Sequence, residues 1–327
     1  MTSETTHRES SRGDPPTPPF LEADQVRVEY GKLVAVRDLS FSLAGGDVLG
    51  LIGPNGAGKT SLLRVLAGLL PPISGTARVR GFDVFREGRQ IRQEIGFAPD
   101  SPPAYEEISL QQFLKFIGLA YGLSGSEADE RIGFWLEALW LVEKRDEKIR
   151  NLSRGMRQRV TLARTLIPNP SVILLDEPSS GLDPAGRIQL RQVFASLRDQ
   201  GRTLIISSHI LADLEEFCTH IAIIEHGRML RFGRTHELTT AHAQKKFFRL
   251  TLDPVPDLAE RMLAEIEGVL AVERRASEFI LETTDSQIRG SDLLRRLVER
   301  KVPVASFLPM RDSLEETYMR SGVKQVD

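Results

Sequence analysis

The chain has 327 residues, of which 41% are hydrophobic and 27% are charged, and its formal net charge at pH 7 is −2. This composition is typical of a globular protein with room for about two domains. The small net charge excludes a strong overall attraction to nucleic acid or to acidic membranes. No stretch is long and apolar enough to span a bilayer. The single cysteine, Cys218, excludes an internal disulfide and favours a reducing compartment.

The first part of the chain is expected to be a tail followed by strands. Residues 1–20 are rich in Ser, Thr and Pro and lack the apolar core of a signal peptide, so we expect a disordered N-terminal tail. Residues 21–52 alternate between apolar and polar side chains, and this alternation predicts half-buried antiparallel strands.

A phosphate-binding loop follows these strands. Residues 53–60 read Gly-Pro-Asn-Gly-Ala-Gly-Lys-Thr, between the apolar run 48–52 and a helical pattern over 61–66. The glycines let backbone N–H groups wrap a polyphosphate, Lys59 supplies a positive charge, and the Thr60 hydroxyl is a ligand for Mg²⁺. The nucleotide-binding residues predicted in this loop are Gly53, Pro54, Asn55, Gly56, Ala57, Gly58, Lys59, Thr60 and Ser61.

The stretch from residue 101 to residue 150 has helical periodicity. Residues 109–121 and 127–142 repeat apolar side chains at the spacing of an amphipathic helix, so we expect two helices there. Trp135 and Trp140 fall in this region, and we interpret both as packing residues of these helices rather than as contacts to a partner.

Two carboxylates end an apolar run in the second half of the chain. Residues 171–178 read Ser-Val-Ile-Leu-Leu-Asp-Glu-Pro, a pattern typical of a central parallel strand covered on both faces. Asp176 would hold Mg²⁺ beside the phosphate loop, and Glu177 would accept a proton from the attacking water. The alternative is a strand that simply ends in solvated acids, but the phosphate loop earlier in the chain favours the catalytic interpretation.

The C-terminal part, residues 241–327, is expected to form a separate small domain. Strand and helix patterns alternate over residues 247–309 in the order β-α-β-β-α-β. The expected strands are residues 247–252, 269–273, 279–283 and 302–308, and the expected helices are 257–266 and 292–300. This order predicts an α+β domain of the ferredoxin-like kind.

Together these motifs resemble those of the ATP-binding subunits of ABC transporters. Residues 151–156 read Asn-Leu-Ser-Arg-Gly-Met and match the family signature Leu-Ser-Gly-Gly-Gln. Tyr30 matches the aromatic residue on which adenine stacks, residues 180–183 match the loop that crosses the dimer interface, and His209 matches the histidine that senses the γ-phosphate. The resemblance covers about residues 21–235.

The resemblance implies an α/β fold with a P-loop ATPase core over residues 21–240, made of an antiparallel β subdomain, a helical subdomain at about 101–150 and a central sheet. ATP and Mg²⁺ are the implied cofactors. Two chains would form a head-to-tail homodimer around two ATP molecules. The residues implied in this site are Glu177 and His209 for catalysis, Tyr30, Ser153, Gly155 and Asp183 for the nucleotide, and Thr60, Asp176 and Asp100 for the metal.

Two positions depart from the family pattern. The signature here continues Arg154-Gly155-Met156 where the family has Gly-Gly-Gln, although Ser153 and Gly155, the implied phosphate contacts, are present. Asp100 stands where the family's switch loop has Gln. An aspartate is a hard oxygen ligand that Mg²⁺ accepts, but it is shorter than Gln and cannot donate a hydrogen bond.

The signature is also expected to begin a helix. Ser153 would be the N-cap of this helix, with its positive dipole end directed at the ATP of the facing subunit. Arg154, Arg157 and Arg159 add positive charge near this end. They fit either a solvated helix face or contacts to phosphate and acidic loops at the dimer interface.

The expected function is therefore an ATPase subunit that powers a separate transmembrane permease. Residues 312–319 resemble the C-terminal helix of export-type subunits, which implies export of a drug, lipid or polysaccharide-like cargo. The subunit would be cytoplasmic, peripheral on the inner face of the membrane, and would not bind nucleic acid. The alternatives are a soluble ABC ATPase of translation or DNA repair, or an ATP-dependent regulatory module without transport. The C-terminal domain would be regulatory, support the dimer, or be a folded appendage.

Overall fold

The computed structural model describes residues 19–100, 105, 107–209, 214, 217–240, 246–275, 278–283 and 288–310. Most of the expected N-terminal tail and all of residues 312–319 lie outside this described part. Phe20, which the sequence analysis assigns to the tail, donates its backbone N–H to Leu43 O over 2.8 Å and packs beside the core of the first sheet. The ordered structure therefore includes Phe20.

The first sheet is antiparallel, as the alternating pattern predicts. Its strands follow the order β2-β1-β4-β5. They are β1 (Leu21–Tyr30), β2 (Leu33–Leu43), β4 (Ser74–Val79) and β5 (Phe82–Asp83). Side chains alternate between buried and more exposed in two parts of β1, Leu21 with Ala23 and Val26 with Val28, because successive residues of a strand point to opposite faces of the sheet. An irregularity between Ala23 and Val26 shifts the alternation by one residue.

The second sheet, called the central sheet below, has the strand order β10-β9-β3-β8-β7-β6. Its strands are β3 (Val48–Ile52), β6 (Ile95–Ala98), β7 (Val172–Asp176), β8 (Thr203–Ser208), β9 (His220–Glu225) and β10 (Arg228–Arg234). All pairs are parallel except β10 with β9. The expectation of antiparallel strands over residues 21–52 is wrong for β3, whose five residues are all buried in this parallel sheet.

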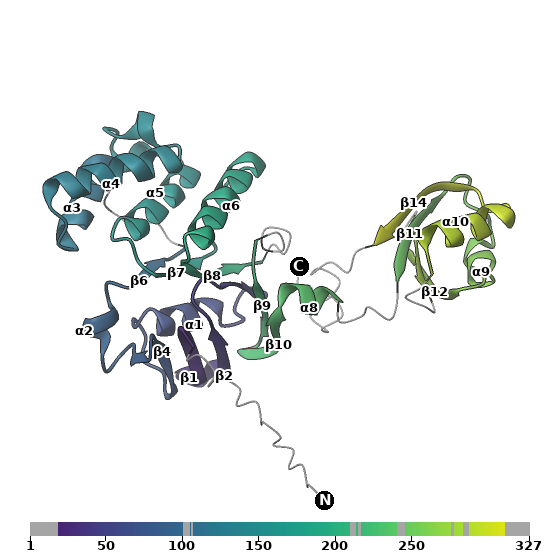
Figure 1. Ribbon diagram of the computed structural model, residues 1–327, viewed down its shortest axis with the longest axis horizontal. Helices are drawn as coiled ribbons and strands as arrows, with labels where there is room; N and C mark the ends of the chain where they lie inside the picture. Colours follow the sequence, from purple (N-terminus) through teal and green to yellow (C-terminus); the bar gives the residue numbers. More distant parts are fainter. Residues whose placement is uncertain are drawn as a thin grey trace, which may run out of the picture.

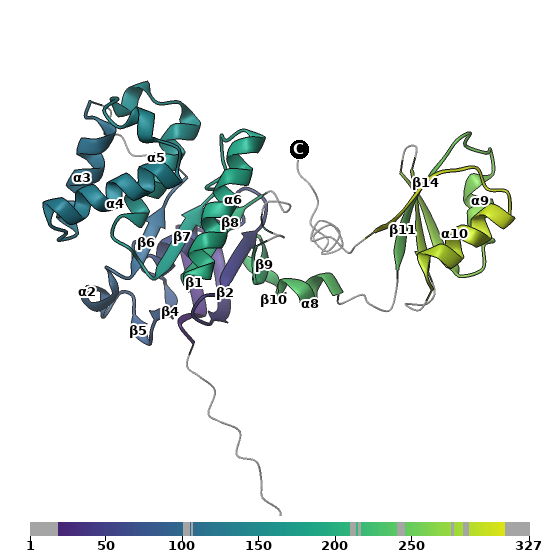
Figure 2. The same cartoon turned by 45° about the horizontal axis from the view of Figure 1, so that its top comes forward.

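Helices cover the central sheet, and Figures 1 and 2 show α5 and α6 on one side of β6, β7 and β8. The helices of this part are α1 (Lys59–Leu66), α2 (Gly88–Ile91), α3 (Leu110–Ala120), α4 (Gly125–Ala138), α5 (Arg154–Leu166), α6 (Pro184–Asp199) and α8 (Thr235–Thr240). Short 3-10 helices span Val142–Lys144 and Ile149–Asn151. The expected P-loop α/β fold is confirmed.

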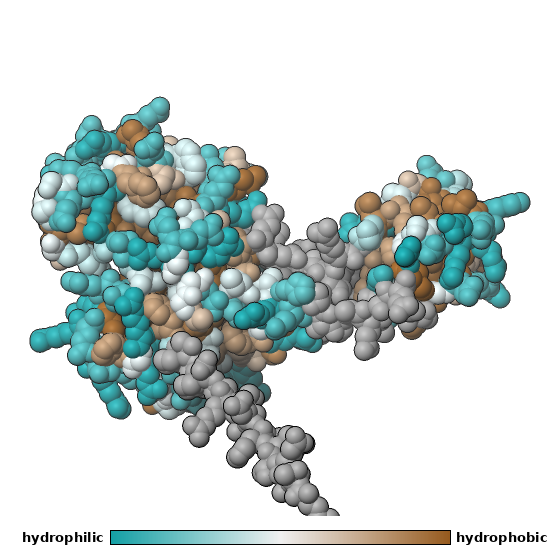
Figure 3. Space-filling model, viewed as in Figure 1, coloured by the Kyte–Doolittle hydropathy of each residue, from teal (hydrophilic) through white to brown (hydrophobic). Residues whose placement is uncertain are grey.

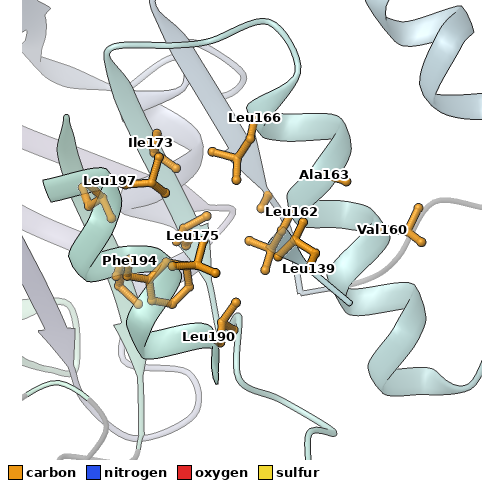
Figure 4. Close-up of a cluster of buried hydrophobic side chains, with 14 of the residues drawn as sticks. Leu139, Val160, Leu162, Ala163, Leu166, Ile173, Leu175, Leu190, Phe194 and Leu197 are labelled. Atoms are coloured by element: carbon orange, nitrogen blue, oxygen red, sulfur yellow. The ribbon is translucent and has the colours of Figure 1, made fainter. Parts of the chain in front are cut away.

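Two hydrophobic cores lie on opposite faces of the central sheet. Side chains of one face of β7 pack with α5 and α6, and Figure 4 shows Leu166, Leu175 and Phe194 pointing toward one another. Side chains of the other face, including Leu174, belong to the core shared with α1 and the antiparallel sheet. A strand buried on both faces needs an apolar side chain at every position, which explains the uninterrupted apolar run of β7.

The expected helical region is present with shifted boundaries. Helix α4 begins after Ser124, whose side chain accepts from Glu127 N in a capping box, and it ends before the expected residue 142. Trp135 packs against the core, whereas Trp140 lies beyond the helix with φ 55° and is 44% exposed. The interpretation of Trp140 as a helical packing residue is therefore wrong, because the chain leaves the helix before reaching it.

The C-terminal part has its own core, which includes Phe248, Leu250 and Phe279. Its elements are β11 (Phe247–Leu252), α9 (Ala259–Ala264), β12 (Val269–Arg275), β13 (Glu278–Thr283), α10 (Gly290–Glu299) and β14 (Val304–Met310). The strands form one antiparallel sheet in the order β12-β13-β11-β14. The two helices thus connect strands in the succession β-α-β-β-α-β.

The surface seen in Figure 3 is largely hydrophilic, with separate apolar spots over both the ATPase core and the C-terminal part. Within the described residues, no helix combines the length and the hydropathy needed to cross a membrane.

Candidate nucleotide-binding site

The phosphate-binding loop joins the end of β3 to the start of α1, as its motif predicts. Gly58 immediately precedes α1 with φ 105°, a conformation that residues with a Cβ rarely adopt. A Cβ on Gly58 would also lie 2.2 Å from Ala35 O, and a Cβ on Gly53 would lie 2.2 Å from Ile224 O. The loop therefore needs glycine at both positions to pass this close to neighbouring backbone.

The amino group of Lys59 lies at the centre of the loop. The side chain is 6% exposed, and Nζ donates to Gly53 O over 2.6 Å and to Pro54 O over 3.3 Å. Nζ also lies 3.4 Å from Glu177 Oε1. Loop carbonyls and one carboxylate thus balance the ammonium charge, and phosphate oxygens are chemically suited to replace them.

The two carboxylates after β7 are held by the neighbouring strand β8. Ser207 Oγ donates to Asp176 Oδ1 over 2.7 Å and accepts from Glu177 N over 2.9 Å. Asp176 is 2% exposed, and Glu177 has φ 47°, so the backbone leaves the extended conformation of the strand at Glu177. Ser207 belongs to none of the predicted motifs. Its one signal in the sequence is a polar residue near the end of a buried strand, two positions before His209.

Glu177 connects the loop to the expected switch residue. Its Oε2 lies 2.8 Å from His209 Nδ1, and its Oε1 is buried without a hydrogen-bond partner, 3.4 Å from Lys59 Nζ. A buried carboxylate oxygen without a donor is unfavourable unless a ligand or water supplies one. The position of this oxygen beside the phosphate loop suits a proton acceptor for a bound water.

A cavity of about 280 Å³ brings these residues together. Besides Leu33 and Ala35, it is lined by the predicted residues Tyr30, Pro54, Asn55, Gly56, Ala57, Gly58, Lys59, Thr60, Ser61, Asp100, Asp176 and Glu177. The Tyr30 hydroxyl lies 3.3 Å from Ser61 Oγ, and the residue is 44% exposed at the edge of the cavity. His209 reaches the site through Glu177.

Asp100 adds a third carboxylate to this site. Burial raises its pKa, and the negative charges of Asp176 and Glu177 raise it further, whereas Arg154 and His209 lower it. The Thr60 hydroxyl with the carboxylates of Asp176 and Asp100 is the set of hard oxygen donors that Mg²⁺ prefers. The residues present therefore fit a magnesium ion, which would neutralise negative charge on a bound triphosphate.

Five predicted residues are not among those that line this cavity: Gly53, His209, Ser153, Gly155 and Asp183. Gly53 accepts from Lys59 Nζ and His209 contacts Glu177, so both lie next to the cavity. Ser153 is the N-cap of α5 and accepts from Met156 N over 3.2 Å. Asp183 is the N-cap of α6 and accepts from Gly186 N over 2.9 Å. Asp183 thus has a capping role within its own chain, which the Asp-Pro pair at the start of a helix could have indicated.

Two of the three arginines at this helix start, Arg157 and Arg159, make contacts within the chain that neither interpretation predicts. Arg157 Nε donates to Leu152 O over 3.1 Å, and Arg159 Nη1 donates to Leu139 O over 3.3 Å. The guanidinium of Arg159 also lies over the Trp140 ring, 5.4 Å from its centroid. Arg159 thus holds α5 to the end of the helical region that precedes it, across 20 positions of the chain, and this contact has no signal in the local sequence.

Comparison with known proteins identifies the class. A family model described as ABC transporter matches residues 36–180. The linearmycin resistance ATP-binding protein LnrL of Bacillus subtilis is 33% identical over 76% of this chain and 81% of that protein. Nod factor export ATP-binding protein I of Ralstonia nicotianae is 31% identical over 92% and 93% of the two chains.

Solved structures agree with this result. An ATP-binding subunit of an ABC transporter matches with 28% identity and a TM-score of 0.63, over 68% of this chain and 93% of that one. CbiO1 from Clostridium perfringens, described as part of the ABC transporter complex cbiONQ, has 26% identity and a TM-score of 0.61, over 67% and 90%. The chain belongs to the ATP-binding proteins of ABC transporters, a family of P-loop ATPases coupled to transport.

Replacement of Ser207 tests how the carboxylates are held. In Ser207→Ala, Asp176 loses a donor and Glu177 N loses its acceptor, so we expect kcat for ATP hydrolysis to fall about ten- to hundredfold. Steady-state ATPase assays measure this effect. Ser42→Ala, at an exposed position of β2, serves as the control. An unchanged kcat in Ser207→Ala would show that the carboxylates keep their positions without this hydroxyl.

Proposed function

We propose that this chain powers export through a separate membrane permease, with two copies closing head to tail around two ATP molecules. The observation that supports this proposal most directly is that the predicted site residues form two separate groups. The cavity contains the residues that hold and hydrolyse a nucleotide, but the signature residues Ser153 and Gly155 do not line it. A second copy would supply them, because the start of α5 carries the free N–H groups and positive dipole that suit a phosphate.

Each residue of the cavity has a defined task in this proposal. Tyr30 stacks on the base, and the phosphate loop wraps the phosphates while Lys59 exchanges its loop carbonyls for phosphate oxygens. Glu177 accepts the proton of the attacking water through the oxygen that lacks a donor. His209 holds the second oxygen and so orients the carboxylate.

Export is supported by the relatives and not by the site itself. One relative is named for resistance to linearmycin and another for export of Nod factor. The second name states export, and on this basis we propose export of a drug, lipid or polysaccharide-like cargo. The proposed location is the cytoplasmic face of the membrane, where ATP is available and a permease is accessible.

A groove of about 450 Å³ is the proposed docking site for the permease. It lies where the ends of α1, α3 and α5 meet β6, and its lining includes Phe97, Ile117, Tyr121 and Arg164. Burial lowers the pKa of the Arg164 guanidinium, and none of the described carboxylates pairs with it. A short apolar segment that carries a carboxylate would complement this groove, because it would supply the missing negative charge.

Capture of the permease tests the proposal. The Glu177→Gln chain, incubated with ATP and detergent-solubilised membranes of the source cell, is expected to recover a multi-span membrane protein that is absent without ATP. Reconstitution of the two proteins in vesicles should then give cargo-stimulated ATP hydrolysis. Recovery of ribosomes or DNA-repair proteins instead would favour the soluble ABC ATPase, and an ATP-dependent dimer with no membrane partner would favour a regulatory module.

A charge reversal in the groove tests the docking site separately. Arg164→Glu is expected to reduce recovery of the permease at least about tenfold, because it repels an incoming carboxylate. Arg164→Gln should give a smaller loss. Arg261→Glu, at an exposed position of α9, is the control, and thermal melting checks that each variant is folded. Equal recovery with Arg164→Glu and with the parent would exclude this groove.

A further inference from the structure

One arginine of α5 contacts two other elements of the chain at once. Nη1 of Arg159 donates to Leu139 O over 3.3 Å, directly after the end of α4. Nη2 donates to Gln189 Oε1 of α6 over 3.0 Å, across 30 positions of the chain. The side chain of Arg159 therefore joins the end of the helical region to α6, although it belongs to neither.

The same guanidinium has two further neighbours that fit its flat shape. It lies over the Trp140 ring, 5.4 Å from the ring centroid. In the first turn of α6, a Cβ on Gly186 would lie 3.0 Å from Nη2, so the glycine leaves room for the guanidinium. A guanidinium donates in several directions from one plane and stacks on an aromatic ring, whereas an ammonium group does not. Lysine at position 159 could therefore reproduce only part of these contacts.

The first turn of α6 is connected to Glu177 by a short segment, residues 177–183. Asp183 Oδ1 accepts from Gly186 N over 2.9 Å, which ties the end of the segment to this turn. At the other end, Ser180 N donates to Glu177 O over 3.0 Å. The position of α6 therefore constrains the segment 177–183, because both of its ends are held by hydrogen bonds.

A second side chain of α5 reaches the start of this segment. Gln158 is 3% exposed, and its Nε2 lies 3.5 Å from Glu177 O. Helix α5 thus contacts Glu177 through Gln158 and α6 through Arg159. Both hydrogen-bond acceptors of Arg159 are uncharged oxygens. Movement of the segment 177–183 can therefore shift these contacts without separating a buried ion pair, which would be costly.

We propose that Arg159 is a positioning residue that couples the segment 177–183 to the end of the helical region. This inference rests on the proposed role of Glu177 in hydrolysis. Arg159 does not line the nucleotide cavity, so it acts through the first turn of α6 and not on ATP itself. A nucleotide that moves Glu177 moves this turn, and Arg159 transmits the movement to Leu139 and Trp140.

The proposed coupling leads toward the groove assigned to the permease. Helix α3 packs against α4, whose end Arg159 holds, and α3 contributes Ile117 to the lining of that groove. The contacts of Arg159 therefore lie between the site of hydrolysis and the proposed docking site.

Steady-state kinetics test the positioning role. Arg159→Gln is expected to lower kcat for ATP hydrolysis about tenfold while KM changes less than about twofold, because the cavity residues are untouched. Arg159→Lys should lie between Arg159→Gln and the parent. Gln189→Ala is expected to lower kcat about threefold and to add no further loss to Arg159→Gln, because both remove the same contact. An additive loss in the double variant, or an unchanged kcat in Arg159→Gln, would overturn the positioning role.

Matched controls separate this effect from a loss of folding. Gln192→Ala removes an exposed amide from the same helix as Gln189 and should leave kcat unchanged. Arg261→Gln removes an exposed arginine of α9 and should also leave it unchanged. Thermal melting checks that each variant is folded. If Arg159→Gln does not fold, Arg159→Lys and Gln189→Ala are compared with the parent in its place.

The fluorescence of Trp140 tests the coupling. The chain has two tryptophans, so Trp135→Phe leaves Trp140 as the only one, 44% exposed and beneath a guanidinium. A non-hydrolysable ATP analogue with Mg²⁺ is expected to shift its emission. Adding Arg159→Gln should remove most of this shift while the affinity for the analogue stays within about twofold, since the cavity is intact. A shift that persists in Arg159→Gln, or no shift in Trp135→Phe when the analogue binds, would overturn the coupling.

The outcomes distinguish this inference from the proposed function. If Glu177→Gln turns over ATP at the parent's rate, the proposed role of Glu177 fails. If Glu177→Gln loses turnover but Arg159→Gln keeps the parent's kcat and the full shift of Trp140, the inference alone fails. Lower turnover in both variants, together with loss of the shift in Arg159→Gln, is the supporting result.

Discussion

Glu177→Gln is expected to lower kcat for ATP hydrolysis about a thousandfold, the range of an enzyme that loses its general base, while ATP remains bound. Glutamine keeps the length of the side chain and can still accept from His209, so the geometry of the cavity is retained. It cannot accept the proton of the attacking water. It also lacks the charge that attracts Lys59 Nζ at 3.4 Å, which frees the ammonium group for the phosphates.

Glu177→Gln is also expected to change the oligomeric state of the chain. Without cleavage, the ATP-bound form accumulates, so Glu177→Gln with ATP and Mg²⁺ should elute as a dimer in size-exclusion chromatography with light scattering. Glu225→Gln is the matched control, because Glu225 ends β9 of the same sheet and does not line the cavity. It should keep normal turnover. A Glu177→Gln chain that hydrolyses ATP at the parent's rate would show that another group acts as the base.

Gly58→Ala is expected to abolish ATP binding and to destabilise the fold. The methyl group would lie 2.2 Å from Ala35 O, inside the van der Waals contact distance, and the residue has φ 105°. A left-handed conformation alone costs an L-residue about 1–2 kcal/mol, and the clash with backbone adds to this cost. Because Ala35 belongs to β2, relief of the clash requires the phosphate loop to move away from the antiparallel sheet.

Gly56→Ala provides the matched comparison for this variant. Gly56 also has a positive φ, 80°, but a Cβ there would meet no atom within 4 Å. It should therefore show only the conformational cost, with a small fall in melting temperature and measurable ATP binding. Differential scanning calorimetry and titration with a fluorescent ATP analogue measure the two quantities. Equal losses in Gly56→Ala and Gly58→Ala would show that the close approach to Ala35 has no part in the effect.

Much of the fold could be predicted because its elements carry strong local signals. The unbroken apolar run before Asp176 identifies a buried parallel strand. The similar run over residues 48–52 is predicted as part of the antiparallel strands, but it forms β3 of the parallel sheet. The Ser-x-x-Glu pattern at Ser124 marks the start of α4, although the expected start was residue 127. The ends of helices were less predictable. Trp140 continues the helical periodicity, but the backbone turns to φ 55° there, and its neighbours Leu139 and Leu141 are the residues that are buried.

The sequence by itself determined the class of the protein and the chemistry of its site. A phosphate loop of three glycines, a lysine and a threonine needs no distant partner to be recognised, because its function depends on residues that are consecutive in the chain. The same holds for the acidic pair that ends a buried strand. The residues of each motif are close together in the chain, so their spacing can be read from the sequence alone.

Only the tertiary structure decided which distant groups meet. Ser207 holds Asp176 across 31 positions of the chain, and Arg154 reaches Ser180 across 26. The parallel order of β7 and β8 places Asp176 beside Ser207, and the packing of α5 places Arg154 on Gly181. Such contacts arise from strand order and helix packing, which depend on the whole core, so no single stretch of sequence contains them.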